Sequence, residues 1–199
     1  MASLTAQAQE PIVADVLIGA GHEGRPQSCA QFPGRKCNMG APGEIEWTPI
    51  VADEAARVLR AHGVSVARLP ADFHGHYDVD AAIFIHFDGH DPVCGSSASI
   101  GYHTPASEPA AKLWRRLYGR YWPFGFQEDN FTENLSRYYG FRQVTASRAA
   151  LVIELGEITC PQQKAWIAAR LQWQGQLLAY FLSDLIGKGN LSDPGAFRE

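Results

Sequence analysis

The sequence predicts a single α/β domain in which a mostly parallel, mixed and twisted sheet is flanked by helices. Apolar runs with the length of buried strands occur at Val13–Ile18, Val64–Leu69 and Ala81–Ile85. A helical pattern separates the first two runs, and two strands that are connected through a helix pair in parallel. A fourth run, Ala149–Ile153, is equally apolar and predicts another strand of the same sheet.

The composition is that of an ordinary globular domain. The chain has 199 residues, of which 46% are hydrophobic and 19% are charged, and its net charge is −4. This length suits one domain with a substantial core. A weakly acidic chain lacks the basic surface that attracts nucleic acids, so we expect no nucleic-acid partner. No apolar run has the length of a transmembrane helix, and we expect no integral membrane contact.

The first helix follows a loop, residues 23–47, that is rich in glycine and proline. Thr48 and Pro49 have the pattern of an N-cap followed by a first-turn proline, and Gly63 ends the helical periodicity. The apolar stripe of this helix consists of Val51, Ala52, Ala55, Val58 and Leu59.

The second half of the chain contains two more helical patterns. Ser99–His103 predicts a short strand, and Ser107 then caps a helix that Gly119 stops. The residues expected to face inward from this helix are Ala110, Leu113, Trp114 and Leu117. Pro161 opens a long last helix that continues to about Ile186.

The segment Arg120–Phe141 is loop-like and contains eight aromatic residues. One interpretation is a packed lid or a separate small hydrophobic cluster. The other interpretation is the wall of a substrate groove. The sequence leaves both open.

The chain contains four cysteines, Cys29, Cys37, Cys94 and Cys160. Cys29 and Cys37 lie in the same loop, so a local disulfide is one expectation and free structural thiols are the other. No Cys-x-x-Cys spacing occurs, which argues against a zinc site made of thiolates.

We expect the folded domain to span residues 12–187. Residues 1–11 lack the charged and apolar regions of a signal peptide, and we expect a disordered segment or an artificial extension there. Residues 188–199 follow a glycine and predict a flexible tail.

Three ionisable side chains stand at the ends of separate predicted strands. His22 follows the first strand after a Gly-Ala-Gly turn, His86 follows the third, and Glu154 follows the fourth. Because the carboxyl ends of parallel strands lie at the same edge of a sheet, we expect these side chains to meet. Either Glu44 or Glu46, in the loop before the first helix, can reach the same edge.

These residue types are those of a catalytic zinc site. Two histidines and one carboxylate form a ligand set that leaves the fourth zinc position open for water. A second carboxylate that does not bind the metal can then act as general base. The long gaps between the candidate ligands fit a site assembled from several strand ends, and the local helical motif His-Glu-x-x-His is absent.

Three short motifs follow three of the predicted strands in order. They are Gly21-His22-Glu23-Gly24, Ile85-His86-Phe87-Asp88, and Ile153-Glu154-Leu155-Gly156 with Thr159-Cys160-Pro161 after it. Together they resemble the zinc-dependent N-acetylmuramoyl-L-alanine amidases of the amidase-3 type. The resemblance runs from about Val13 to the terminal helix and covers most of the chain.

The resemblance implies a Zn²⁺ ion at the carboxyl ends of the strands. It implies that His22, Glu44 and His86 bind this ion and that Glu154 is the catalytic glutamate. Glu44 is preferred over Glu46 because its distance from Gly63 in the sequence is similar to the family's spacing. The implied substrate is the amide between the lactyl group of N-acetylmuramic acid and L-alanine in peptidoglycan.

Further residues are candidates for the cleft. Asp88 matches a polar position of the family and can orient the ligands, and Glu157 stands where the family has an apolar residue. His103 either lines the cleft or is an ordinary edge-strand histidine. A local metal cluster of His86, Asp88 and His90 is disfavoured, because these side chains share a face only if the strand continues past Asp88.

We therefore predict a peptidoglycan hydrolase, similar to an endolysin or a cell-wall remodelling enzyme, and we expect a monomer. Its substrate requires a site of action outside the cytoplasm, in the periplasm, in the wall or after secretion. An export signal is not visible, so delivery as a phage-encoded or effector protein fits as well. The alternatives are a zinc exopeptidase or deacylase that acts on a different amide, and a degenerate wall-binding domain.

Overall fold

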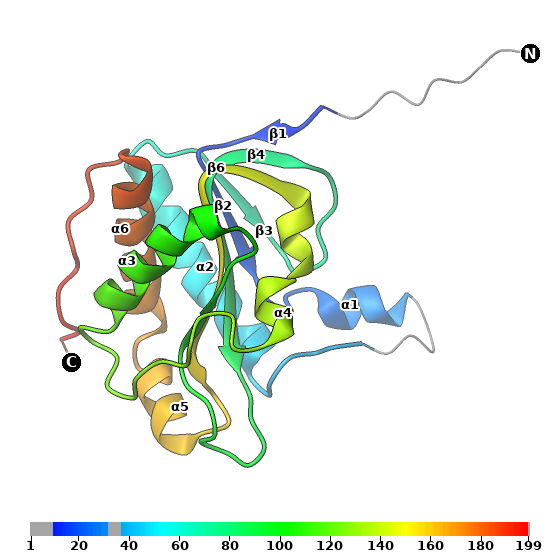
Figure 1. Ribbon diagram of the computed structural model, residues 1–199, viewed down its shortest axis with the longest axis vertical. Coiled ribbons are helices and arrows are strands. Elements are labelled where there is room, and N and C mark those ends of the chain that lie inside the picture. The colour runs from blue at the N-terminus through cyan, green and yellow to red at the C-terminus, as the bar shows by residue number, and fades with distance from the viewer. Residues whose placement is uncertain (1–9, 32–36, 199) are drawn as a thin grey trace, which may run out of the picture.

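A six-stranded sheet crosses the centre of the computed structural model (Figure 1). The structure describes residues 10–31 and 37–198. The strands are β1 (Ile12–Val13), β2 (Val16–Ala20), β3 (Val66–Leu69), β4 (Tyr77–Asp88), β5 (Ser99–Gly101) and β6 (Val144–Glu157). Their order is β3-β2-β4-β6-β5, with β1 paired to β4. Among the described strands β5 alone runs antiparallel to its neighbour, so the predicted mixed, mostly parallel sheet is confirmed.

Helices lie on both sides of this sheet. They are α1 (Arg25–Ala30), α2 (Glu44–Ala61), α3 (Glu108–Tyr118), α4 (Glu133–Ser136), α5 (Pro161–Ala168) and α6 (Leu171–Ile186), with 3-10 turns η1 (Pro105–Ser107) and η2 (Tyr139–Gln143). Helices α2, α3 and α6 cover one face, whereas α1 and α4 lie on the other side (Figure 1).

The sheet is buried on both faces, which explains the continuous apolar runs of its strands. Successive residues of a strand point to opposite faces. Val16 and Ile18 of β2 accordingly join the larger core cluster, with residues of α2, α3 and α6. Leu17 joins a smaller cluster on the other face, with Phe73 and Phe84. The predicted β-α-β unit is present as β2, α2 and β3, with β2 and β3 parallel.

The predicted start of the first helix at Thr48 was wrong, because α2 begins one turn earlier at Glu44. Gly43 makes the turn into the helix with a left-handed φ of 102°. Pro49 therefore lies inside the helix. The hydroxyl of Thr48 is buried and donates a hydrogen bond of 2.7 Å to the Gly21 carbonyl, so it ties α2 to the end of β2.

Two further expectations about helices were wrong. The long helix after Pro161 is divided into α5 and α6. In α3, Leu113 is 38% exposed instead of facing the core. The buried face of α3 is set by Trp114 and Tyr118, whose rings stack at 5.2 Å, and the Tyr118 hydroxyl donates to the carbonyl of Leu155 at 2.8 Å.

All four cysteines are paired in disulfides, Cys29 with Cys37 and Cys94 with Cys160. The first pair joins the end of α1 to the following loop. The second pair joins the loop after β4 to the residue that precedes α5 and was not predicted from the sequence. Its partners are 66 residues apart, so only the tertiary structure brings them together.

The C-terminal residues lie against the domain. Lys188 forms an ion pair of 2.6 Å with Asp15, and the indole of Trp173 donates to the carbonyl of Gly195 at 2.9 Å. Leu191 and Phe197 pack against the larger core cluster. The flexibility of this tail stays a prediction. Residues 1–9 lie outside the described residues. Within the described ranges, no helix is both long and apolar enough to cross a membrane.

Candidate metal centre

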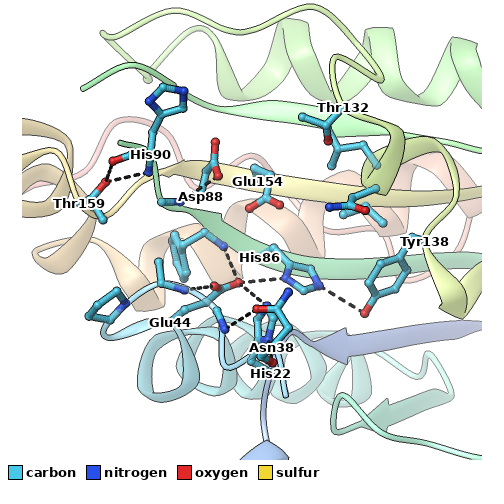
Figure 2. Close-up of a pocket in the computed structure, with 18 of the residues that line it drawn as sticks. His22, Asn38, Glu44, His86, Asp88, His90, Thr132, Tyr138, Glu154 and Thr159 are labelled. Carbon is cyan, nitrogen blue, oxygen red and sulfur yellow. Dashed lines mark hydrogen bonds and ion pairs between the residues drawn. The ribbon is translucent and has the colours of Figure 1, made fainter. Parts of the chain in front are cut away.

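His22, Glu44 and His86 converge at the carboxyl edge of the sheet, and Figure 2 shows their side chains facing one another. His22 follows β2, Glu44 is the first residue of α2, and His86 lies near the end of β4. All three residues are buried, with 8%, 2% and 7% of their surfaces exposed. His22 has a φ of 59°, a left-handed conformation that non-glycine residues adopt rarely.

The distances within this group match the spacing of metal ligands. Glu44 Oε1 lies 2.9 Å from His86 Nδ1 and 3.5 Å from His22 Nε2. Each residue offers one ligand atom, and these atoms all lie within 4.8 Å of one another. Tetrahedral zinc with bonds of about 2.0–2.1 Å separates its ligand atoms by about 3.3 Å. The donor set of two imidazoles and one carboxylate therefore fits Zn²⁺ and leaves a fourth position open.

Glu44 is fixed by hydrogen bonds from the backbone. The amide of Ala41 donates to Oε2 at 2.9 Å and the amide of Phe87 donates to Oε1 at 3.1 Å. Burial opposes the negative charge, but the hydrogen bond with His86 and the charges of both histidines keep the pKa of Glu44 below its usual value. Burial lowers the pKa of His22, which favours the neutral imidazole that a metal requires.

Glu154 lies beside this group on the neighbouring strand, in register with His86. Its Oε2 atom is buried and has no hydrogen-bond partner among the described residues. Burial raises the pKa of Glu154 well above its usual value, and the negative charges of Glu44 and Asp88 raise it further. A carboxyl with this environment is suited to exchange a proton with a bound molecule.

A cavity of about 740 Å³ opens over these side chains. Its lining includes His22, Glu44, His86, Asp88, His90, Tyr138 and Glu154. Part of the aromatic segment predicted either as a packed lid or as a groove wall lines the cavity, through Phe131, Tyr138 and Tyr139. The same segment also packs on the smaller core cluster, through Tyr138, Tyr139 and Phe141.

The other candidate residues lie at different distances from the cavity. Asp88 lines it and accepts hydrogen bonds from the Ser96 hydroxyl and the Gly89 amide. His103 is exposed and does not belong to the lining, and neither does the exposed Glu46. His90 lines the cavity, but its Nδ1 atom lies 2.8 Å from the carbonyl of Pro92, outside the His22, Glu44 and His86 group.

Glu157 is completely buried, and it also lies outside the cavity lining. Its carboxylate accepts hydrogen bonds from the amides of Cys94 and Ser96, each 2.7 Å long, and from the hydroxyl of Thr159 at 2.6 Å. These bonds and the disulfide hold the loop after β4 against the start of α5.

Two contacts of the histidines were not foreseen. The Nδ1 atom of His22 lies 3.0 Å from the carbonyl oxygen of Asn38, and the Nε2 atom of His86 lies 3.3 Å from the hydroxyl of Tyr138. A backbone carbonyl leaves no signal in the side-chain sequence. The aromatic character of the segment around Tyr138 was a signal, although it did not single out this residue.

Solved structures with the same fold are peptidoglycan amidases. No family model and no curated protein matches the sequence. The catalytic domain of CwlV, an N-acetylmuramoyl-L-alanine amidase from Bacillus (Paenibacillus) polymyxa var. colistinus, matches with a TM-score of 0.61 and 14% identity, over 89% of this chain and 99% of that one. The N-acetylmuramyl-L-alanine amidase Ami1 from Mycobacterium smegmatis matches with a TM-score of 0.60 and 16% identity, over 88% and 97%.

The catalytic domain of the CD27L endolysin, which targets Clostridia Difficile, matches with a TM-score of 0.57 and 14% identity, over 89% of this chain and 99% of that domain. Sequence identities this low establish a similarity of fold alone. The sheet order, the helices around it and the His22, Glu44 and His86 group agree with the fold expected from the sequence motifs. This chain therefore has the α/β fold of the N-acetylmuramoyl-L-alanine amidases of the amidase-3 type.

Proposed function

We propose that this chain is a zinc-dependent hydrolase of the amide between N-acetylmuramic acid and L-alanine in peptidoglycan. One observation carries the proposal: the buried group of His22, Glu44 and His86 lies beside Glu154, whose Oε2 atom has no hydrogen-bond partner among the described residues. A domain that only binds the wall has no use for an unpaired buried carboxyl, since leaving such a group unpaired costs about 1–3 kcal/mol.

His22, Glu44 and His86 would hold the metal through Nε2, Oε1 and Nδ1. The chemistry that zinc would supply when bound there is polarisation of the scissile carbonyl and a lowered pKa of water. Glu154 accepts the proton of the attacking water and delivers it to the nitrogen of the leaving L-alanine. A general base works best when its pKa lies near the operating pH, and the raised pKa of Glu154 is shifted in that direction.

Two further observations support the assignment. The cavity of about 740 Å³ is within the range of small-molecule sites, about 300–1,000 Å³, and has room for the reacting part of a muropeptide. The two disulfides are typical of proteins in oxidising compartments. The cavity and the disulfides both fit an enzyme that acts on the wall outside the cytoplasm. The expected monomeric state stays a prediction.

Product analysis tests the proposal. Purified peptidoglycan is digested with the protein, with the protein after zinc has been removed by a chelator, and with the same sample after zinc is restored. Mass spectrometry then identifies the products. We expect free stem peptides that begin with L-alanine, released only when zinc is present.

The variant His86→Ala serves as the matched control, because it removes one candidate ligand and leaves Glu154 in place. It should release no peptides at any zinc concentration used for the wild type. Peptides that are cut at another bond would indicate an exopeptidase or a deacylase instead. An intact wall that nevertheless binds the protein would indicate a wall-binding domain.

A further inference from the structure

Tyr138 makes a contact that the proposed reaction does not explain. This residue lies between α4 and η2, in the aromatic segment, and its hydroxyl is 3.3 Å from Nε2 of His86 (Figure 2). Nε2 is the ring nitrogen on the opposite side from Glu44. Tyr138 is not one of the candidate ligands, so this contact links the wall of the cavity to the candidate ligand His86.

The positions of the ring nitrogens assign a role to each of them. Nδ1 of His86 lies 2.9 Å from Glu44 Oε1, and Nε2 of His22 lies 3.5 Å from the same oxygen. These two nitrogens converge, so they are the ones available to a metal. A neutral imidazole carries a single N–H group, and coordination through Nδ1 requires that His86 carry it on Nε2. The Tyr138 oxygen is then the acceptor of that N–H.

His22 has the reverse arrangement. Its Nε2 atom faces Glu44, and its Nδ1 atom lies 3.0 Å from the carbonyl of Asn38, which can only accept a hydrogen bond. With a metal bound at Nδ1 of His86 and Nε2 of His22, the two histidines would be opposite tautomers, and the Asn38 carbonyl and the Tyr138 hydroxyl would be their acceptors outside the ligand group. Such outer acceptors orient metal-binding histidines and set which nitrogen is free.

The ring of Tyr138 is held firmly in this position. It contacts the rings of Phe84 at 4.8 Å and Phe141 at 6.0 Å between centroids. Gly140 leaves the space for this packing, because an added Cβ atom would lie 2.6 Å from Phe84 Cζ and 2.8 Å from Tyr138 Cε1.

We propose that Tyr138 is a positioning residue that holds His86 as the Nε2–H tautomer and thereby presents Nδ1 to the metal. This inference rests on the zinc site of the proposed function but not on the identity of the amide substrate. It also gives the aromatic segment a second task besides lining the cavity, because metal binding and the position of this wall become coupled.

Zinc affinity tests the inference without any activity assay. Competition with a zinc chelator measures the dissociation constants of the wild type, Tyr138→Phe and Tyr77→Phe. Tyr77 is the matched control, since it packs in the same smaller core cluster, lies outside the cavity lining, and its hydroxyl faces the carbonyl of His74 at 3.5 Å. Tyr138→Phe should bind zinc about 10- to 100-fold more weakly. Tyr77→Phe should bind zinc as the wild type does.

Nitrogen-15 NMR of the zinc-loaded wild type gives a second readout that needs no variant. We expect the ring proton of His86 on Nε2 and that of His22 on Nδ1. A ring proton on Nδ1 of His86, or a Tyr138→Phe protein with unchanged zinc affinity, would overturn the inference while leaving the metal site intact. A wild type that does not bind zinc would overturn the proposed function as well, so the two failures are distinguishable.

Discussion

At the scale of single residues, three buried or partly buried carboxyl groups near the sheet edge have different environments. Glu157 accepts three hydrogen bonds and holds a loop. Glu44 accepts two from backbone amides and faces both histidines. Glu154 has one oxygen without a partner among the described residues. The three residues are all glutamates, and their hydrogen bonds distinguish them. Glu157 anchors a loop, Glu44 is a candidate metal ligand, and Glu154 is the candidate base.

This difference predicts the effect of replacing Glu154 with glutamine. The substitution keeps the size of the side chain but removes its ability to accept and release a proton, so turnover of peptidoglycan should fall by about 10²- to 10⁴-fold. The zinc content of the purified protein should not change, because none of the three candidate ligands is altered. Kinetic assays together with metal analysis check both points, and near-normal activity would remove Glu154 from the proposed role.

The raised pKa of Glu154 also predicts how the stability of the zinc-free protein varies with pH. The unfolded carboxyl titrates near pH 4.3, and above this pH the folded state still holds the proton. The folded state then binds more protons than the unfolded state, so stability falls as the pH rises toward the folded pKa. The Glu154→Gln variant has no titratable carboxyl at this position, so its stability does not fall with pH for this reason.

Thermal unfolding of both zinc-free proteins between about pH 4 and pH 8, which brackets the unfolded carboxyl pKa, measures this effect. The melting temperature of Glu154→Gln relative to the wild type should increase steadily with pH. A difference that stays constant over this range would mean that Glu154 titrates normally in the folded protein.

At the scale of elements, the close approach of β2 and β4 positions His86. A Cβ atom added to Gly21 would lie 2.5 Å from Nδ1 and Cε1 of His86 and 2.6 Å from the carbonyl oxygen of Ile85. The glycine before His22 is therefore required by packing, in addition to any role in the turn. The two candidate histidine ligands are brought together because no side chain separates their strands at this point.

Gly21→Ala should consequently weaken zinc binding. The added methyl group must displace His86 or the end of β4, with an overpacking cost of about 1–3 kcal/mol in unfolding free energy. Gly63→Ala is a suitable control, because no atom would lie within 4 Å of its added Cβ. Gly63 lies at the opposite end of α2 from Glu44, with a φ of 77°. The control should lose stability by about 1 kcal/mol but keep its zinc affinity. Equal zinc affinities in all three proteins would contradict this account of how His86 is positioned.

At the scale of the whole molecule, the C-terminal segment connects parts of the chain that are far apart in the sequence. Asp193 accepts a hydrogen bond of 3.1 Å from Tyr121, and Lys188 pairs with Asp15 near the start of the domain. The guanidinium of Arg170 lies 4.7 Å from the centre of the Phe197 ring. These contacts extend the packed structure beyond the last helix.

Deletion of residues 188–199 should therefore lower the free energy of unfolding by about 2 kcal/mol, from the partial burial of two apolar side chains, Leu191 and Phe197. Phe197→Ala alone should account for about half of this loss. Urea denaturation of the three proteins measures both values. An unchanged stability in the truncated protein would favour the flexible tail that the sequence predicts.

Local patterns were sufficient to predict a mostly parallel sheet and the edge where the candidate site lies. The predicted buried strand Val13–Ile18 was wrong at its start, because Val13 is exposed and belongs to the separate strand β1, and the buried strand begins at Val16. The apolar runs that end near His22, His86 and Glu154 are strand signals that depend on nearest neighbours and on burial. In a parallel sheet the carboxyl ends of the strands lie at the same edge. The fold class and the position of the candidate site could therefore be inferred before any coordinates were known.

The details of the site depend on contacts between residues distant in the sequence. The start of α2 at Glu44 depends on a glycine turn that overrides the Thr48 and Pro49 signal. The Cys94–Cys160 disulfide and the contact between Tyr138 and His86 join residues 66 and 52 positions apart, which no local pattern reports. Periodicity and strand ends in the sequence determined which residues share an edge of the sheet. Tertiary packing alone decided the hydrogen-bond and disulfide partners of these residues, because side-chain orientation and hydrogen bonding depend on what surrounds each residue in space.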